Sequence, residues 1–247
     1  MTVSIITPTY NSQDFIHQTI EAIINQSYTN WELLITDDYS TDATWSILTK
    51  YAESEPRIKI FRLEQNLGPG VARNNSIKHA KGRYIAFCDS DDVWVSDKLE
   101  KQLRFLNKNN IQFTYSAYQK IDEENKKGGI VKPPTIVSYN NLLKTCSIGC
   151  LTAIYDTEKI GKIYMPEIRK RQDYGLWLKI FQRIGTTKGM VEVLGFYRER
   201  KNSVSSNKVK AAQYHYKVLR EVAQIPFYKA WYYFLHYAFA GLFKYLK

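Results

Sequence analysis

The sequence predicts an α/β protein with a mostly parallel central sheet flanked by helices. Short apolar, β-rich runs alternate with amphipathic helical stretches over the first 95 residues, which is typical of a parallel sheet covered on both faces. Each of the four apolar runs is followed by polar or acidic residues. Because ligands of such sheets bind at the carboxyl ends of the strands, we expect a binding site along that rim.

The four predicted strands lie between predicted helices. They are Val3–Thr7, Glu32–Thr36, Arg57–Leu63 and Tyr84–Cys88. We expect Ser12 and Thr41 to cap the first two helices, and the third to run over Val71–Ala80 and close at Gly82.

The second half is less regular. Helices are predicted over Asp97–Asn107 and Asp173–Ile184, the latter with Leu176, Trp177, Ile180 and Phe181 inward. Strands are predicted at Gln112–Lys120, Cys150–Tyr155 and Met190–Tyr197, with an exposed hairpin or loop tip at Asp122–Gly129. We expect both halves to share one continuous sheet.

Charge and cysteine content restrict the possible partners and compartment. The chain of 247 residues has a formal net charge of +11, and from Arg198 onward ten Lys or Arg stand against two acids. A basic end of this kind suits nucleic acid, anionic lipid headgroups or a phosphate-bearing substrate. Three cysteines without framework spacing, and no cationic start followed by an apolar run, lead us to expect a reducing cytoplasm.

The strongest candidate for chemistry is Asp89-Ser90-Asp91-Asp92, directly after the fourth predicted strand. Carboxylates at alternating positions of an extended segment point the same way, so Asp89 and Asp91 can share one Mg²⁺ or Mn²⁺. Such a cation neutralises a departing diphosphate. The structural alternative is a solvated acidic turn that caps the next helix.

Other polar residues follow the remaining strands. Asp37 and Asp38 can accept hydrogen bonds from a base or a ribose, or else begin an Asx-type turn before Thr41. Arg73 starts the helix after the third strand end, where Asn66 lies, and is placed to meet a phosphate or a sugar unless it is a surface residue.

These residues together resemble glycosyltransferase family 2. The matching segments are Val3-Ser4-Ile5-Ile6-Thr7-Pro8-Thr9-Tyr10-Asn11, Asp37-Asp38-Tyr39-Ser40-Thr41-Asp42, Asn66-Leu67-Gly68, Ala72-Arg73-Asn74 and Asp89-Ser90-Asp91-Asp92. Weaker matches are Gln172-Asp173-Tyr174-Gly175-Leu176-Trp177-Leu178 and Tyr197-Arg198 with Asn202-Ser203-Val204-Ser205. Each segment alone is a weak signal, but their order and spacing make the set specific.

The resemblance implies the GT-A fold, an inverting transfer and a nucleotide-sugar donor, most often a UDP-sugar. It implies that Asp91 holds the metal, that Arg73 and Asp89 contact the donor, and that Asp173 is the general base, unless Asp173 is an ordinary helix cap. Uridine would be held by Pro8, Thr9, Tyr10 and Asp38. We place Asp37, Asn66 and Asp92 among the substrate-binding residues, and Asp89 beside Asp91 as a second metal ligand.

The resemblance also implies a division of the chain into three parts, and the sequence departs from the family pattern at two positions. Residues 1–95 would bind the nucleotide sugar, 96–206 the acceptor, and 207–247 would form a basic aromatic helical tail. Gln172 replaces the usual Glu, and Arg200 stands where many relatives carry a His. An Arg cannot ligate a cation but pairs with phosphate, so Arg198, Arg200 and Lys201 are interpreted as diphosphate contacts in a loop.

The tail is predicted to form two helices, Asn207–Ile225 and Phe227–Lys247. The second carries no formal charge from Ala230 to Phe243, which is shorter than a membrane span requires. Lys229, His236, Lys244 and Lys247 fall on one stripe, as in a helix lying on an anionic membrane surface. The alternative is a packed C-terminal helix or a dimer contact.

Three functions are weighed. The first is a metal-dependent glycosyltransferase, peripheral on the inner face of the membrane, that extends a lipid-linked saccharide of a surface polysaccharide. The second is a nucleotidyltransferase, but the loop Pro8–Gln13 lacks the Gly and basic residues that a triphosphate needs. The third is a non-catalytic binding module. Acidic strand ends would repel nucleic acid, so none is expected as a ligand.

Overall fold

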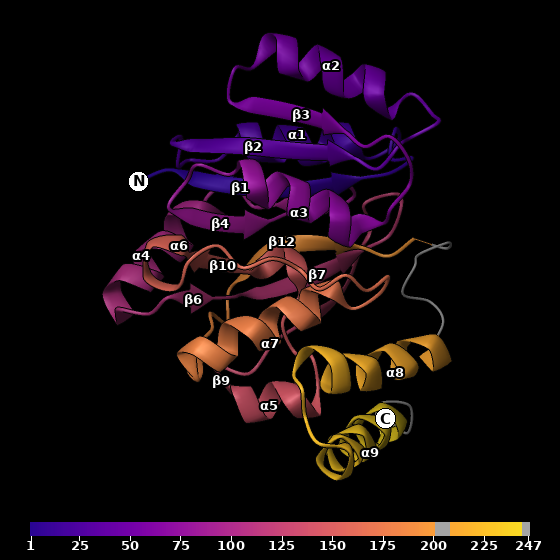
Figure 1. Ribbon diagram of the computed structural model, residues 1–247. Coiled ribbons are helices and arrows are strands. Elements are labelled where there is room, and N and C mark those ends of the chain that lie inside the picture. The colour runs from indigo at the N-terminus through magenta and orange to yellow at the C-terminus, as the bar shows by residue number, and fades with distance from the viewer. Residues whose placement is uncertain (201–207, 244–247) are drawn as a thin grey trace.

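The computed structural model describes residues 1–200 and 208–243, and its central element is a six-stranded sheet (Figure 1). The strands lie in the order β3-β2-β1-β4-β10-β6. Their bounds are β1 Val3–Thr9, β2 Trp31–Asp37, β3 Ile58–Arg62, β4 Tyr84–Phe87, β6 Phe113–Thr114 and β10 Ile154–Asp156. The first four are mutually parallel, so the predicted fold class and the four predicted strands are confirmed.

Helices cover both faces of this sheet because strand residues alternate between two apolar clusters (Figure 1). One cluster holds Ile5 and Leu33 with side chains of α1 Ile16–Ile24, α2 Thr44–Ser54 and α4 Lys98–Asn109. The other holds Ile6 and Leu34 with side chains of α3 Pro69–His79, α5 Tyr139–Lys144 and α7 Gln172–Ile184. Both faces of the sheet are therefore buried beneath helices, as is typical of parallel sheets.

The expectation of one continuous sheet is wrong for most of the second half. Only β6 and β10 join the main sheet, antiparallel to one another. The remaining strands are β5 Val93–Trp94, β7 Ala117–Ile121, β8 Lys127–Val131, β12 Val193–Arg198, β9 Ile136–Ser138 and β11 Thr186–Lys188. They form a four-stranded sheet, β5-β12-β7-β8, and a two-stranded one, β11-β9. The chain changes sheets at Tyr115 and Ser116, which divide the predicted strand Gln112–Lys120.

The predicted helix ends need three corrections. Helix α1 begins at Ile16, four residues beyond Ser12, whose hydroxyl bonds instead to Tyr10 O and Ser90. Helix α2 begins at Thr44, beyond Thr41, where the side chain of Asp42 accepts the Thr44 amide. Gly82 does not close α3, which ends at His79. A Cβ on Gly82 would lie 2.7 Å from the Ser4 amide nitrogen, so this glycine lets the chain pass close to β1.

The predicted orientation of α7 is confirmed. Its inward residues Leu176, Trp177, Ile180 and Phe181 are fully buried. The Trp177 ring lies 5.5 Å from Phe87 and 5.3 Å from Phe113, both in the sheet. Asp173 sits one turn before Trp177 on the same side of the helix, so this packing carries it beyond the strand ends. The predicted strand Cys150–Tyr155 is a 3₁₀ turn, Cys150–Thr152, followed by β10, and α6 Thr157–Ile160 comes next.

The C-terminal helices pack beside α5 and α7 (Figure 1). Helix α8 Lys208–Lys217 continues into a π-helical turn, Val218–Val222, and α9 Phe227–Phe243 follows. His215 is buried between the rings of Tyr174 and Tyr237, with centroids 4.9 and 4.1 Å away. Within residues 1–200 and 208–243, no helix is long and apolar enough to cross a membrane. Asn207, Lys244 and Lys247 of the predicted tail lie outside the described residues.

Candidate active site

A cavity of about 890 Å³ lies at the carboxyl ends of β1, β2 and β4. Its lining includes most of the predicted site residues: Pro8, Thr9, Tyr10, Asp38, Asn66, Arg73, Asp89, Asp91, Asp92, Asp173, Arg198 and Arg200. The fold therefore brings together side chains that the sequence spreads over nearly 200 positions. The predicted location of the site at this rim follows from the parallel register, in which Thr9 lies beside Asp37 and Asp37 beside Arg62.

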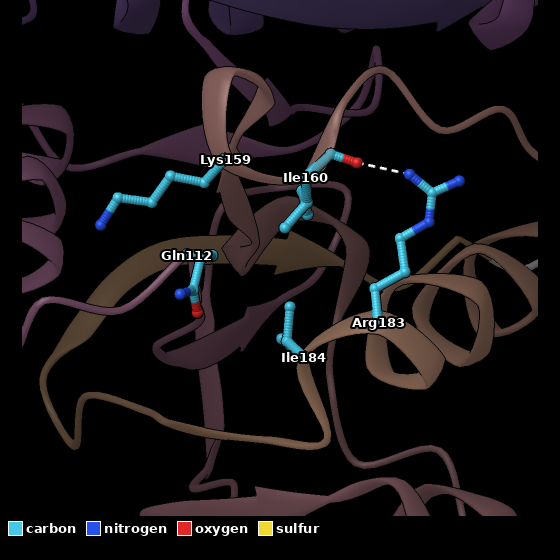
Figure 2. A pocket seen from close by; sticks show the side chains of 5 residues that line it. All are labelled: Gln112, Lys159, Ile160, Arg183 and Ile184. Atoms are coloured by element: carbon cyan, nitrogen blue, oxygen red, sulfur yellow. Dashed lines mark hydrogen bonds between the residues drawn. The ribbon is translucent and has the colours of Figure 1, made fainter.

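A second cavity, of about 400 Å³, lies where β6 begins (Figure 2). Gln112, Lys159, Ile160, Arg183 and Ile184 line it, and the Arg183 guanidinium donates a hydrogen bond to the Ile160 carbonyl. No carboxylate is among these lining residues, so the larger cavity is the candidate for acid–base and metal chemistry.

Asp38 shapes one wall of the large cavity. Its two carboxylate oxygens accept the amides of Leu67 and Gly68, each at 2.8 Å. Its own amide donates to Thr9 O at 2.8 Å, and Asn66 Nδ2 donates to its carbonyl. Burial raises the pKa of Asp38, although the two amides oppose the shift. Asp38 thus fixes the Asn66–Gly68 loop and keeps further lone pairs for a ligand.

Asp37 does not reach the cavity. Its side chain is fully buried and accepts the Ser40 amide and hydroxyl, and it pairs with Arg62 at 3.3 Å. The turn interpretation therefore holds for Asp37, and its assignment to the substrate-binding residues is a correction. The reason is strand alternation, because neighbouring side chains at the end of β2 leave on opposite sides.

Two acid–base pairs face the cavity from the Asp89–Asp92 loop and its neighbours. Arg73 is 7% exposed, pairs with Asp89, and keeps its buried Nε without a partner among the described residues. Arg200 pairs with Asp91 at 3.4 Å. Burial and then the charge of Asp89 raise the pKa of Asp91. A cation at the loop would relieve the repulsion between Asp89 and Asp91.

The loop fits a hard divalent cation that takes some of its ligands from the substrate. Asp89 and Asp91 line the same cavity, and their side chains are 27% and 23% exposed. No group of three or more His, Cys, Asp or Glu side chains suited to a metal occurs in the described part of the chain. Mg²⁺ and Mn²⁺ need only one or two protein carboxylates when phosphates and water complete the shell. Asp89 and Asp91 would hold the ion, which would stabilise the charge of a diphosphate.

Arg198 fixes the conformation of the Asp89–Asp92 loop through hydrogen bonds. Its guanidinium donates to the Asp91 carbonyl, the Asp122 carbonyl and Gln18, each at 2.9 Å, and its amide donates to Asp92 Oδ1 at 3.0 Å. All three guanidinium nitrogens are engaged and the side chain is 2% exposed. These contacts give Arg198 a structural role in the loop, and because it also lines the cavity its diphosphate contact stays a prediction. Of the other two predicted contacts, Arg200 lines the cavity, and Lys201 lies outside the described residues, as does Asn202–Ser205.

Asp173 lines the same cavity from the first turn of α7. It is not the N-cap, which is Arg171 with φ 63°. Asp173 lies close enough to Arg73 to help raise the pKa of that guanidinium, after the larger opposing effect of burial and the effects of Asp89 and Cys150. Asp173 is thus within electrostatic range of Arg73, which pairs with Asp89 of the acidic loop.

The cavity lining also includes residues to which the sequence interpretation assigned no substrate, metal or catalytic role, although some belong to the matching motifs. They are Asn11, Ser12, Gly68, Pro69, Ser90, Tyr118, Gly149, Cys150, Leu151, Arg169, Lys170, Arg171, Gln172 and Tyr197. The sequence interpretation also assigned no role to Gly70, where a Cβ would lie 2.8 Å from Gln172 Cγ. The run of three basic residues before Asp173 was a readable signal, whereas Tyr118 and Cys150 come from segments without a motif.

Comparison with known proteins identifies the family. The family model described as "Glycosyl transferase family 2" matches residues 4–161. The chain belongs to glycosyltransferase family 2. The transferase is thus an enzyme of the class that its strand-end motifs indicate.

Relatives of similar length support this assignment. The transferase is 43% identical over 237 residues to the putative teichuronic acid biosynthesis glycosyltransferase TuaG of Bacillus subtilis, covering 96% of this chain and 94% of that protein. It is 39% identical over 243 residues to WfgD of Escherichia coli, covering 98% and 94%. WfgD is named as a UDP-Glc:alpha-D-GlcNAc-diphosphoundecaprenol beta-1,3-glucosyltransferase.

Solved structures support the GT-A fold. Residues 1–349 of S. aureus TarS in complex with UDP-GlcNAc match with a TM-score of 0.73 and 27% identity, covering 90% of the transferase and 66% of that chain. The mannosyltransferase PcManGT from Pyrobaculum calidifontis, in complex with GDP-Man and Mn²⁺, matches in fold with a TM-score of 0.63 and 21% identity.

Proposed function

We propose that the transferase moves a sugar, with inversion, from a UDP-sugar to a hydroxyl of a lipid-linked saccharide during surface-polysaccharide synthesis, aided by Mn²⁺ or Mg²⁺. One observation carries the proposal: Asp38, Arg73, Asp89 and Asp91 line a single cavity that Asp173, from a different element, also lines. The UDP-GlcNAc bound to TarS and the acceptor named for WfgD support the donor and acceptor classes.

The donor side supplies binding and charge stabilisation. Thr9, Asp38 and the Asn66–Gly68 loop form a polar wall that suits a nucleoside. The free Nε of Arg73 is a donor aimed at no described partner, and Arg200 adds a second guanidinium. Preorganised cations stabilise a leaving diphosphate because they need no rearrangement as its charge develops.

We assign Asp173 the role of general base. An inverting displacement requires a group that takes the proton of the acceptor hydroxyl on the side opposite the leaving group. Asp173 is half-buried, lines the cavity and comes from a different element than the donor-side acids. No covalent intermediate on the protein is needed, so the two walls divide the chemistry between leaving-group stabilisation and proton removal.

We place the transferase at the inner face of the cell membrane, in the cytoplasm, through α9. Its exposed side chains include Phe227, Tyr228, Trp231, Tyr232 and Leu235, at 44–69%. Ala230 is buried and Tyr233 and Tyr237 are half-buried on the side that packs on the domain. Aromatic side chains of this kind favour the headgroup region of a bilayer, where basic residues add attraction to anionic lipid.

Binding of UDP by calorimetry, with and without Mn²⁺, tests the donor site. We expect Mn²⁺ to strengthen binding at least tenfold in the wild type and to have little effect in Asp91→Asn, which lacks one ligand charge. Glu53→Gln, an exposed carboxylate on α2, is the matched control and should behave as the wild type. Equal metal dependence in wild type and Asp91→Asn would remove Asp91 from the metal site. Absence of UDP binding in the wild type would refute the donor assignment.

A further inference from the structure

Three consecutive basic residues form the part of the cavity wall that precedes Asp173. Arg169, Lys170 and Arg171 all line the cavity, together with Gln172 and Asp173. The donor-side cations differ in that Arg73 and Arg200 already pair with Asp89 and Asp91. The basic segment is therefore a second region of positive charge, on the acceptor side of the site.

The charges of the two arginines in this segment are not paired with acids among the described residues. None of the ion pairs between described residues involves Arg169 or Arg171, and the Arg169 side chain is exposed. Desolvation raises the pKa of the half-buried Cys146 thiol, Asp173 raises it further and Arg171 lowers it, so both charged groups lie close to the thiol. An anionic ligand beside Asp173 would therefore find guanidinium groups whose charge is available.

The segment is held in place by α9. Arg171 adopts a left-handed backbone conformation, φ 63°, and its guanidinium donates to the Tyr237 hydroxyl at 2.7 Å. Tyr237 in turn stacks on buried His215. The basic segment is thus built against the same helix that exposes Trp231, Tyr232 and Leu235, so a ligand with an anionic head and a lipid chain matches both features.

We infer that Arg169, Lys170 and Arg171 bind the diphosphate of a diphosphate-linked lipid acceptor and so present its sugar hydroxyl to Asp173. This inference rests on the proposed function. Arginine binds phosphate oxygens through two parallel N–H donors, and lysine adds a compact charge. Arg169 and Asp173 are four residues apart, so their Cα atoms lie within about 14 Å of one another and both can reach one acceptor that carries a sugar ring and a diphosphate.

Direct binding of geranyl diphosphate, a short prenyl diphosphate, tests the site without requiring transfer. The protein is first saturated with UDP and Mg²⁺ so that the donor site is filled, and the ligand is then titrated by calorimetry. We expect Arg169→Gln/Lys170→Gln to weaken binding about 10- to 100-fold, since two charge-assisted contacts are lost. Lys50→Gln/Lys108→Gln removes two exposed charges from α2 and α4 and should bind as the wild type.

Two further measurements separate the possible outcomes. Geraniol and geranyl monophosphate should bind much more weakly than the diphosphate. Transfer to N-acetylglucosaminyl diphosphate on an undecyl chain should lose about 10- to 100-fold in kcat/KM in the double variant, while transfer to the same sugar on a plain undecyl glycoside stays within twofold. Equal geranyl diphosphate affinity in wild type and double variant, or equal loss with both acceptors, would overturn the inference. Failure of the proposed function is distinct, because UDP itself would then not bind.

Discussion

Gly70 offers a test of how closely the two walls of the site are coupled. It lies in the first turn of α3, and a Cβ at this position would lie 2.8 Å from Gln172 Cγ and 3.5 Å from Gln172 Cδ and Nε2. Carbon atoms in contact prefer about 3.5–4.0 Å, so in Gly70→Ala the Gln172 side chain must yield by about 1 Å. Asp173 is the next residue, and we expect it to move with Gln172.

The expected effect on catalysis is larger than the effect on stability. A misplacement of about 1 Å in a reacting group costs about 100-fold in rate, so kcat should fall 10- to 100-fold. In the helix, alanine gains about 1 kcal/mol over glycine, whereas overpacking costs about 1–3 kcal/mol. The free energy of unfolding should therefore fall by no more than about 2 kcal/mol, and UDP affinity should be unchanged because the donor wall does not move.

Steady-state kinetics, UDP calorimetry and urea unfolding of four proteins decide the matter. They are the wild type, Gly70→Ala, Gln172→Ala and the double variant. Removing the Gln172 side chain beyond Cβ eliminates the contact, so the double variant should match Gln172→Ala. If Gly70→Ala is as active as the wild type, or if the double variant is no better than Gly70→Ala, the close approach of α3 and α7 does not position Asp173.

The other predictions concern the base, the sheet and α9. Asp173→Asn should lower transfer about 1,000-fold while UDP affinity stays constant by calorimetry, and loss of UDP binding would contradict its assignment as base. Burial opposes ionisation of Glu32, but hydrogen bonds led by Lys59 outweigh it and lower the pKa of Glu32 below its ordinary value. A lowered carboxyl pKa stabilises the fold above the unfolded value of about 4.3, and this stabilisation is lost as the pH falls. Glu32→Gln should therefore cost about 2 kcal/mol of unfolding free energy at pH 7 and progressively less below pH of about 4 in urea titrations; a constant difference would refute this. Trp231→Ser/Leu235→Ser should reduce sedimentation with phosphatidylglycerol vesicles roughly 30-fold without changing transfer to a soluble acceptor, and unchanged sedimentation would argue against α9 as the membrane contact.

The polar residues at the strand ends were predictable from the sequence because the strand and the polar residue that follows it are both local features. A run of four to seven β-rich apolar residues forms a buried strand, and the polar residue after it must lie at the rim. The placement of Thr9, Asp38, Asp89 and Asp91 follows from this pattern and the parallel register. Asp173 was found by resemblance of its helix, and the apolar period of α7 explains why it faces the cleft.

The hydrogen-bond and ion-pair partners of individual polar side chains were decided only by the tertiary structure. Asp37 and Arg198 are of residue types that bind substrates, yet each already has several protein partners, and Arg198 bonds to a residue as distant in sequence as Gln18. Sequence spacing does not reveal such partners. The division of the second half into separate sheets was equally unreadable, because short strands pair with segments far away and their patterns do not name the neighbour.

The sequence by itself thus determined the α/β class, the first four strands, the rim that carries the site and the family, since these depend on periodicity and on the order of motifs along the chain. Tertiary structure alone decided which acids line the cavity and that Arg198 fixes the Asp89–Asp92 loop. It also placed Arg169–Arg171 in the cavity lining beside Asp173 and bonded Arg171 to Tyr237. The physical reason is that hydrogen-bond and ion-pair partners are chosen by distance in space, and the fold sets those distances.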